Sequence, residues 1–166
     1  MKKALLVLYV SIACLLCGCS SGSNDSTAYK DLKFGMTLDE VRSKGFCSDT
    51  HPITKDGMLN YKCSTSDFAG CQYEKAELSF KNNKLVKIYF FNSTSDPEKQ
   101  KEISKKVTNY LTSNFGPSRN INKCEGWKDK NRTFILYIHS NVDENMKSTY
   151  INELAIFSND LHKSQE

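Results

Sequence analysis

Apolar and polar residues alternate along several stretches of this 166-residue chain, which predicts half-buried β-strands. The alternation is clear at residues 59–63 and 76–80. Two asparagines within residues 81–84 tolerate a positive φ, as the tight turn of a β-hairpin requires. The return strand, residues 85–91, carries apolar side chains on both faces, so we expect it in the centre of a sheet. Three more strand candidates follow, at residues 121–127, 133–139 and 150–158.

Two segments carry the signals of helix starts. Thr37 precedes Glu40 by three residues, the spacing of a capping box, and Gly45 ends the short helix that follows. Residues 95–98 hold an N-cap candidate, a proline at the first helical position and an acid in the first turn, and residues 116–117 (Gly-Pro) end this second helix. The residues on its predicted apolar face are Ile103, Val107, Tyr110, Leu111 and Phe115, opposite a lysine row that we interpret as a solvated face or a contact for lipid phosphates or an acidic partner.

These elements predict an α+β domain over residues 29–158, with helices packed on an antiparallel sheet. The order helix, three strands, helix, three strands suggests a duplicated α-β-β-β unit with halves at residues 29–93 and 94–158. Residues 159–166 are expected to be a frayed tail.

The N-terminus has the layout of a secretory signal. Two lysines precede an apolar run over residues 4–16, which is too short to cross a bilayer as a helix. The end of this run, residues 16–19 (Leu-Cys-Gly-Cys), resembles the lipobox of bacterial lipoproteins. The resemblance implies that residues 1–18 are cleaved and that Cys19 carries a diacylglycerol and usually a further acyl chain such as palmitate. The alternative is a plain secretory signal that releases a soluble protein.

The residues after Cys19 extend this interpretation. Ser20 in place of aspartate resembles the lipoproteins sorted to the outer membrane, facing the periplasm. Residues 19–28 are small and polar apart from Cys19, and they are typical of a flexible tether that keeps the domain near the lipid. Removal of the signal leaves 21 basic and 19 acidic residues, a net charge of +2, which does not favour nucleic acid as a partner.

The first helix start also carries a family resemblance. Residues 35–37 (Gly-Met-Thr), followed by Val41, are similar to the element that opens the domain of BamE-like (SmpA/OmlA-type) outer-membrane lipoproteins and of the related β-lactamase-inhibitor-like fold. The resemblance implies a domain of helices packed on an antiparallel sheet that binds other proteins rather than catalysing a reaction.

Four cysteines remain in the mature chain after Cys19 is set aside. An even number in an oxidising compartment predicts two disulfide bonds, and four cysteines allow three pairings. We favour Cys47 with Cys63 and Cys71 with Cys124. Zinc is the competing use, because Cys47 and His51 are four residues apart, but the chain has no Cys-x-x-Cys pair in this region.

Catalytic patterns are weak, so we expect no enzyme and no cofactor. A thiol nucleophile would need an unpaired cysteine beside His51 or His139, and the chain has neither a glycine-rich phosphate loop nor a Gly-x-Ser-x-Gly motif.

The preferred function is a lipid-anchored periplasmic protein-interaction module, either an accessory subunit of an envelope complex or a docking inhibitor. The alternative is an envelope hydrolase or small-ligand binder. Aromatic residues dominate interface energies, and the candidate partner contacts are Tyr73, Tyr89 and Trp127, for each of which ordinary packing in the core or on the sheet is the alternative.

Overall fold

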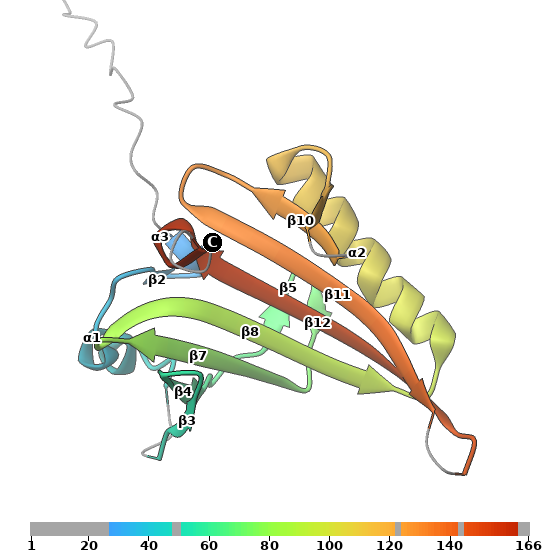
Figure 1. The fold of residues 1–166 in the computed structure, drawn as a ribbon, viewed down its shortest axis with the longest axis horizontal. Coiled ribbons are helices and arrows are strands. Elements are labelled where there is room, and N and C mark those ends of the chain that lie inside the picture. Colours follow the sequence, from blue (N-terminus) through green and yellow to red (C-terminus); the bar gives the residue numbers. More distant parts are fainter. Residues whose placement is uncertain (1–26, 48–50, 122–123, 143–144, 163–166) are drawn as a thin grey trace, which may run out of the picture.

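The computed structural model describes residues 27–47, 51–121, 124–142 and 145–162. The signal peptide, Cys19 and most of the predicted tether therefore lie outside the described residues. Strands make up 52% of the structure, and eight of them form one antiparallel sheet in the order β3-β4-β7-β8-β12-β11-β10-β9, called the main sheet below. Figure 1 shows β8, β12 and β11 as long neighbouring ribbons in its middle.

The strands of the main sheet differ widely in length. The eight strands are β3 (Ile53–Lys55), β4 (Met58–Lys62), β7 (Lys75–Lys81), β8 (Lys84–Thr94), β9 (Arg119–Ile121), β10 (Cys124–Lys128), β11 (Arg132–Val142) and β12 (Ser148–Ser158). Two further pairs stand apart from it: β1 (Thr27–Tyr29) with β2 (Leu32–Lys33), and β5 (Asp67–Phe68) with β6 (Cys71–Gln72).

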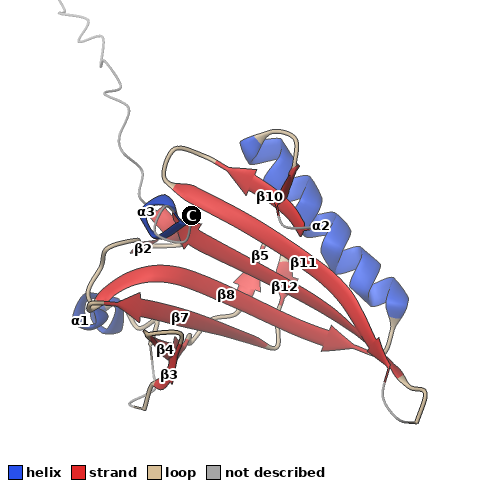
Figure 2. Cartoon of the chain, viewed as in Figure 1, coloured by secondary structure: helices blue, strands red, loops and turns tan. Residues whose placement is uncertain are grey.

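Among the described residues, helix is confined to α1 (Leu38–Ser43), α2 (Pro97–Phe115) and α3 (Asn159–His162), and α2 is the long helix in Figure 2. The predicted fold class, helices packed on an antiparallel sheet, is therefore wrong: the structure is mostly β. The error came from the helix starts, which are strong local signals but do not report how far a helix continues. The first of these starts opens only six residues, of which Val41 alone is buried.

The predicted duplicated α-β-β-β unit is also wrong. In the described chain α1 is followed by four strands of the main sheet and α2 by four more, with β5 and β6 inserted in the first half. The two halves meet where β8 pairs with β12, from Lys87 opposite Phe157 to Thr94 opposite Tyr150. The last strand in the sequence therefore lies in the middle of the sheet.

Both predicted helix starts are confirmed at the level of hydrogen bonds. Glu40 N lies 3.3 Å from Thr37 Oγ1, and Thr37 N donates to Glu40 Oε2 at 2.6 Å, which closes the capping box. These bonds from Thr37 lower the pKa of the Glu40 carboxyl. Asp96 caps α2, because its Oδ1 accepts from Glu98 N at 2.9 Å. The predicted hairpin turn is confirmed as well, with Asn82 and Asn83 at φ of +51° and +57°.

The buried core lies between α2 and one face of the main sheet. From α2 it includes Ile103, Val107 and Leu111, which pack toward fully buried strand residues such as Phe90 and Leu154. None of the helices among the described residues has the length and the apolar character that crossing a bilayer requires.

The first and last described residues form structure that the sequence does not predict. Asn159, the first residue of the predicted frayed tail, starts α3 and donates from Nδ2 to the carbonyl oxygens of Asp129 (3.0 Å) and Lys130 (2.9 Å). Its Oδ1 accepts from Thr133 Oγ1 at 2.8 Å. The tail prediction is therefore wrong at Asn159. At the other end, β1 begins at Thr27, within the predicted tether.

Candidate protein-binding surface

The main sheet presents a second face, opposite α2, that we call the uncovered face. Side chains alternate along a strand, so the neighbours of core residues point to this face. On β12, the buried Leu154 and Ile156 alternate with half-buried residues of the uncovered face. The side chains considered below are Lys75 and Glu77 on β7, Lys87, Tyr89 and Phe91 on β8, Tyr137 and His139 on β11, and Glu153 and Phe157 on β12.

Lys87 lies on this face near the start of β8, one of the two middle strands of the main sheet. Its ammonium nitrogen lies 5.3 Å from the ring centroid of Tyr89 and 5.7 Å from that of Phe157, within the range of cation–π attraction. Burial lowers the pKa of the Lys87 ammonium, while the negative charges of Glu77 and Glu153 act in the opposite direction. Lys87 is therefore a partly desolvated cation between two rings.

Tyr89 and Glu153 form the adjoining part of the face. Burial raises the pKa of the Tyr89 phenol, and its hydrogen bond with the Glu153 carboxylate raises it further. Both residues line an open hollow of about 440 Å³ together with Lys87 and Glu77. The hollow combines cationic, anionic and aromatic groups within one small area.

The same combination continues on both sides of the hollow. Lys75 lies 3.3 Å from a Glu77 carboxylate oxygen and 5.0 Å from the ring centroid of Phe91. On β11, the rings of Tyr137 and His139 lie against each other, with centroids 4.5 Å apart. Tyrosine is among the residue types enriched at interface hot spots.

The structure separates the three predicted partner contacts. Tyr89 lies on the uncovered face, as described above. Tyr73 and Trp127 are only 2% and 1% exposed, so the expectation that they present free rings is wrong. Tyr73 packs against Phe90 with ring centroids 5.4 Å apart, and Trp127 Nε1 lies 3.2 Å from Thr112 Oγ1 of α2. Both rings belong to the core between α2 and the main sheet.

The structure places Cys47 and Cys63 opposite each other. They are antiparallel bridge partners, and Ser64 N donates to Phe46 O at 2.9 Å. This bond flanks the cysteine pair, so the two form a non-hydrogen-bonded pair, for which the Cα atoms lie about 4.5 Å apart. That separation is within the 4.4–6.8 Å that a disulfide bond spans. The structure contains no disulfide bond among its described cysteines.

Cys71 and Cys124 are not brought together. The Cys71 sulfur lies 4.0 Å from the carbonyl oxygen of Ile103 on α2, and burial raises the pKa of this thiol. Cys124 begins β10, where the next residue, Glu125, faces α2 and lies 3.3 Å from Thr108. Alternation therefore directs Cys124 to the opposite face of the sheet from Cys71.

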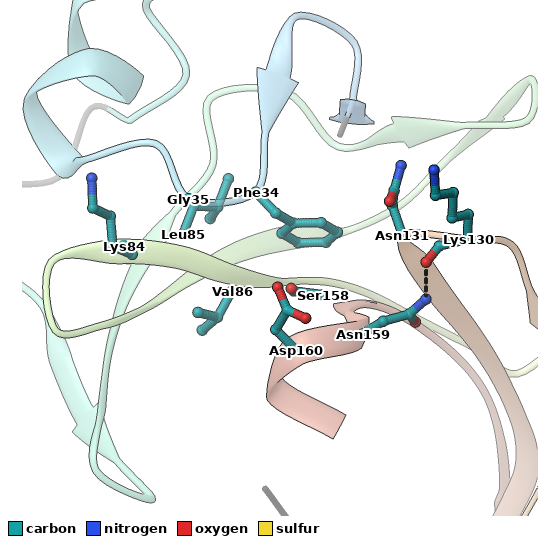
Figure 3. A pocket seen from close by; sticks show the side chains of 10 residues that line it. All are labelled: Phe34, Gly35, Lys84, Leu85, Val86, Lys130, Asn131, Ser158, Asn159 and Asp160. Carbon is teal, nitrogen blue, oxygen red and sulfur yellow. Dashed lines mark hydrogen bonds between the residues drawn. The ribbon is translucent and has the colours of Figure 1, made fainter. Parts of the chain in front are cut away.

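A second hollow, of about 320 Å³, lies beside α3, where β8 begins and β12 ends (Figure 3). Phe34 and Leu85 form part of its wall, with Lys84 at one side and Asp160 on α3 below. Its lining has no histidine, cysteine or glutamate, and its ionisable side chains are Lys84, Lys130 and Asp160. Among the described residues, no group of three or more His, Cys, Asp or Glu side chains is placed to hold a metal ion.

Sequence reasoning missed Lys87 and Glu153 as site residues. The available signal was the position of each charge inside an otherwise apolar strand, at residues 85–91 and 150–158. A charge at such a position is costly unless it faces solvent or a partner, and this would have identified the uncovered face.

Comparison with known proteins adds a family but no activity. A family model described as "Uncharacterised protein" matches residues 29–157. Comparisons with curated proteins and with solved structures gave no match. The similarity to BamE-like lipoproteins therefore stays a prediction. Because the match spans most of the chain and nearly all of the described fold, the protein belongs to this uncharacterised family.

Proposed function

We propose that the chain is a lipid-anchored protein-interaction module of the bacterial periplasm, acting as an accessory subunit of an envelope complex or as a docking inhibitor. In this proposal Cys19 carries the lipid and holds the domain at the outer membrane. The uncovered face of the main sheet binds the partner.

The observation that carries the proposal is the environment of Lys87. Its ammonium is already partly desolvated by Tyr89 and Phe157. A partner carboxylate that approaches Lys87 therefore meets a cation that has lost part of its water, so less desolvation remains to oppose the ion pair. The flanking rings supply the apolar contact area that dominates binding energies at protein interfaces.

The shape of the face favours a protein over a small molecule. Sites for small ligands enclose most of the ligand surface. The hollow beside Lys87 is only partly enclosed, and residues of β3 and β4 line it together with residues of β7, β8 and β12. The exposed rings match the aromatic enrichment of protein interfaces, and the lysines and carboxylates beside them match the polar rim of such interfaces.

Crosslinking in intact cells followed by purification from membranes tests this proposal. We expect a stoichiometric protein partner with the wild-type chain and with Lys44→Glu, a control that reverses an exposed lysine just after α1. Lys87→Glu and Tyr89→Ala should lose the partner. Equal capture by all variants would refute the role of the uncovered face, and the absence of any stoichiometric partner would refute the interaction module.

The anchor is tested separately. Metabolic labelling with palmitate should mark the wild-type chain and leave Cys19→Ser unlabelled. An unlabelled wild-type chain would refute the lipid anchor and leave the test of the uncovered face unaffected.

A further inference from the structure

Strand β11 extends well beyond its neighbour β10. The pairing of β10 with β11 ends at Glu125 opposite Leu136, whereas the pairing of β11 with β12 continues from Arg132 to Val142. In the described chain, no strand therefore pairs with the outer side of residues 137–142, which we call the β11 overhang. Figure 1 shows β11 and β12 running together past the end of β10. At about 3.3 Å per residue, the overhang is roughly 20 Å long.

The overhang has backbone groups directed outward. Gln100 Nε2 lies 3.1 Å from His139 O and 3.4 Å from Ile151 O, so the carbonyl groups of this cross-strand pair point into the space between β11 and β12. Backbone direction alternates along a strand, and the N–H and C=O groups of Ile138, Ser140 and Val142 therefore point away from β12. These groups are ready to pair with another strand.

The overhang lacks the features by which sheets normally prevent such pairing. The terminal strands of the main sheet, β3 and β9, have three residues each and carry Lys55 and Arg119. Short, charged edges of this kind discourage edge-to-edge association. The overhang has six residues, no charge, no proline and no glycine, and Ile138 and Val142 are 41% and 59% exposed.

We propose that the β11 overhang pairs antiparallel with the same segment of a second copy of the chain. With the two-fold axis at Ser140, Ile138 faces Val142 of the other copy twice, and His139 faces Asn141. This register joins outward-directed residues to outward-directed residues and forms roughly six backbone hydrogen bonds. It also covers two exposed apolar side chains from each copy.

The self-complementary pattern favours a second copy over another partner. The apolar residues Ile138 and Val142 lie at equal distances from Ser140, and a two-fold interface requires such symmetry. The β11 overhang carries no charge that would attract an oppositely charged peptide. For the same reason, two copies of the overhang do not repel each other. The inference does not rest on the proposed partner binding at the uncovered face.

Sedimentation of the full chain in density-matched detergent tests the proposal. We expect a concentration-dependent dimer for the wild type. The double variant Ile138→Lys/Val142→Lys places lysines opposite each other twice and should weaken the dimer roughly tenfold or more. The matched control Ile53→Lys/Leu59→Lys also changes two exposed apolar residues, at the other side of the sheet, and should leave the dimer unchanged.

A crosslinking experiment keeps the proposal falsifiable if a lysine variant folds poorly. Residues paired across the axis have Cα atoms about 5.5 Å apart, which a disulfide bond can span. Mild oxidation of Ser140→Cys should give a dimer in which position 140 is linked to itself, whereas Lys105→Cys should not. A monomer throughout the concentration series, equal weakening by both double variants, or no linkage at position 140 would each overturn the proposal.

Discussion

The facing positions of Cys47 and Cys63 predict a disulfide bond in the mature protein, and its removal should have a defined cost. The bond would close a loop of about 16 residues, for which the loss of loop-closure entropy from the unfolded chain corresponds to about 3 kcal/mol. Both cysteines are buried, at 9% and 4% exposed, and serine is close to cysteine in size. The double variant Cys47→Ser/Cys63→Ser should therefore lose mainly the crosslink, about 3 kcal/mol of unfolding free energy.

Urea denaturation measures this loss directly. The wild type should unfold at a lower urea concentration when a reductant is present, and the double variant should unfold near that lower midpoint with or without reductant. Alkylation of the denatured, unreduced wild type, followed by mass spectrometry, should show that the thiols of Cys47 and Cys63 are protected.

Two results would refute the reasoning. If protein isolated from an oxidising compartment has both thiols reactive, the pair is not bonded despite its geometry. If the thiols are protected but the reductant leaves the urea midpoint unchanged, the stability assigned to loop closure is wrong. Cys71→Ser provides the control, because the sulfur of Cys71 faces α2, away from this pair.

Four further predictions concern stability and follow from single side chains. Leu154→Ala, at a fully buried position in the central strand, should cost about 2–5 kcal/mol in chemical denaturation, whereas Ile53→Ala at a 69% exposed position should change little. Thr37→Ala removes the cap of α1 and should cost about 1 kcal/mol by the same assay. Asn159→Ala leaves two carbonyl groups and a hydroxyl without their partner and should cost about 1–3 kcal/mol; an unchanged midpoint would show that α3 is not held by this side chain. Lys87→Met should raise the melting temperature at neutral pH, because a lowered pKa in the fold means that the charged form of Lys87 opposes folding. The gain should diminish as the pH rises from the folded pKa of Lys87 to the unfolded value near 10.5, and a melting temperature below that of the wild type at neutral pH would contradict this.

Local signals were predicted correctly because they depend on neighbouring residues alone. The cap at Thr37, the proline start of α2 and the paired asparagines of the hairpin each act within four residues. The existence of the long strands was also clear from alternation. These signals are short-range, so they say where an element begins but not how many elements a sheet contains or how they are ordered.

The site was harder to predict because the type of a residue does not show on which face of the sheet its side chain lies. Tyr73 and Tyr89 are the same residue type, yet one packs against Phe90 in the core and the other lies beside Glu153. The difference depends on which face α2 covers, and this is a tertiary property. Cys47 and Cys63 lie opposite each other, and their disulfide bond stays a prediction. Cys71 and Cys124 lie on opposite sides of the main sheet, which the sequence could not show without knowing which face α2 covers.

The central position of β12 also has a consequence for how the chain reaches its native state. Strand β8 pairs with β12, which lies more than fifty residues further along the sequence. Such long-range pairing gives the sheet a high contact order, so we expect it to fold slowly. During synthesis the first half can form only a four-stranded sheet, in which β8 is a long edge strand without its partner. This edge of β8 would stay exposed until β12 has been synthesised. A chain that lacks β12 would keep the exposed edge permanently and should be prone to aggregation and proteolysis.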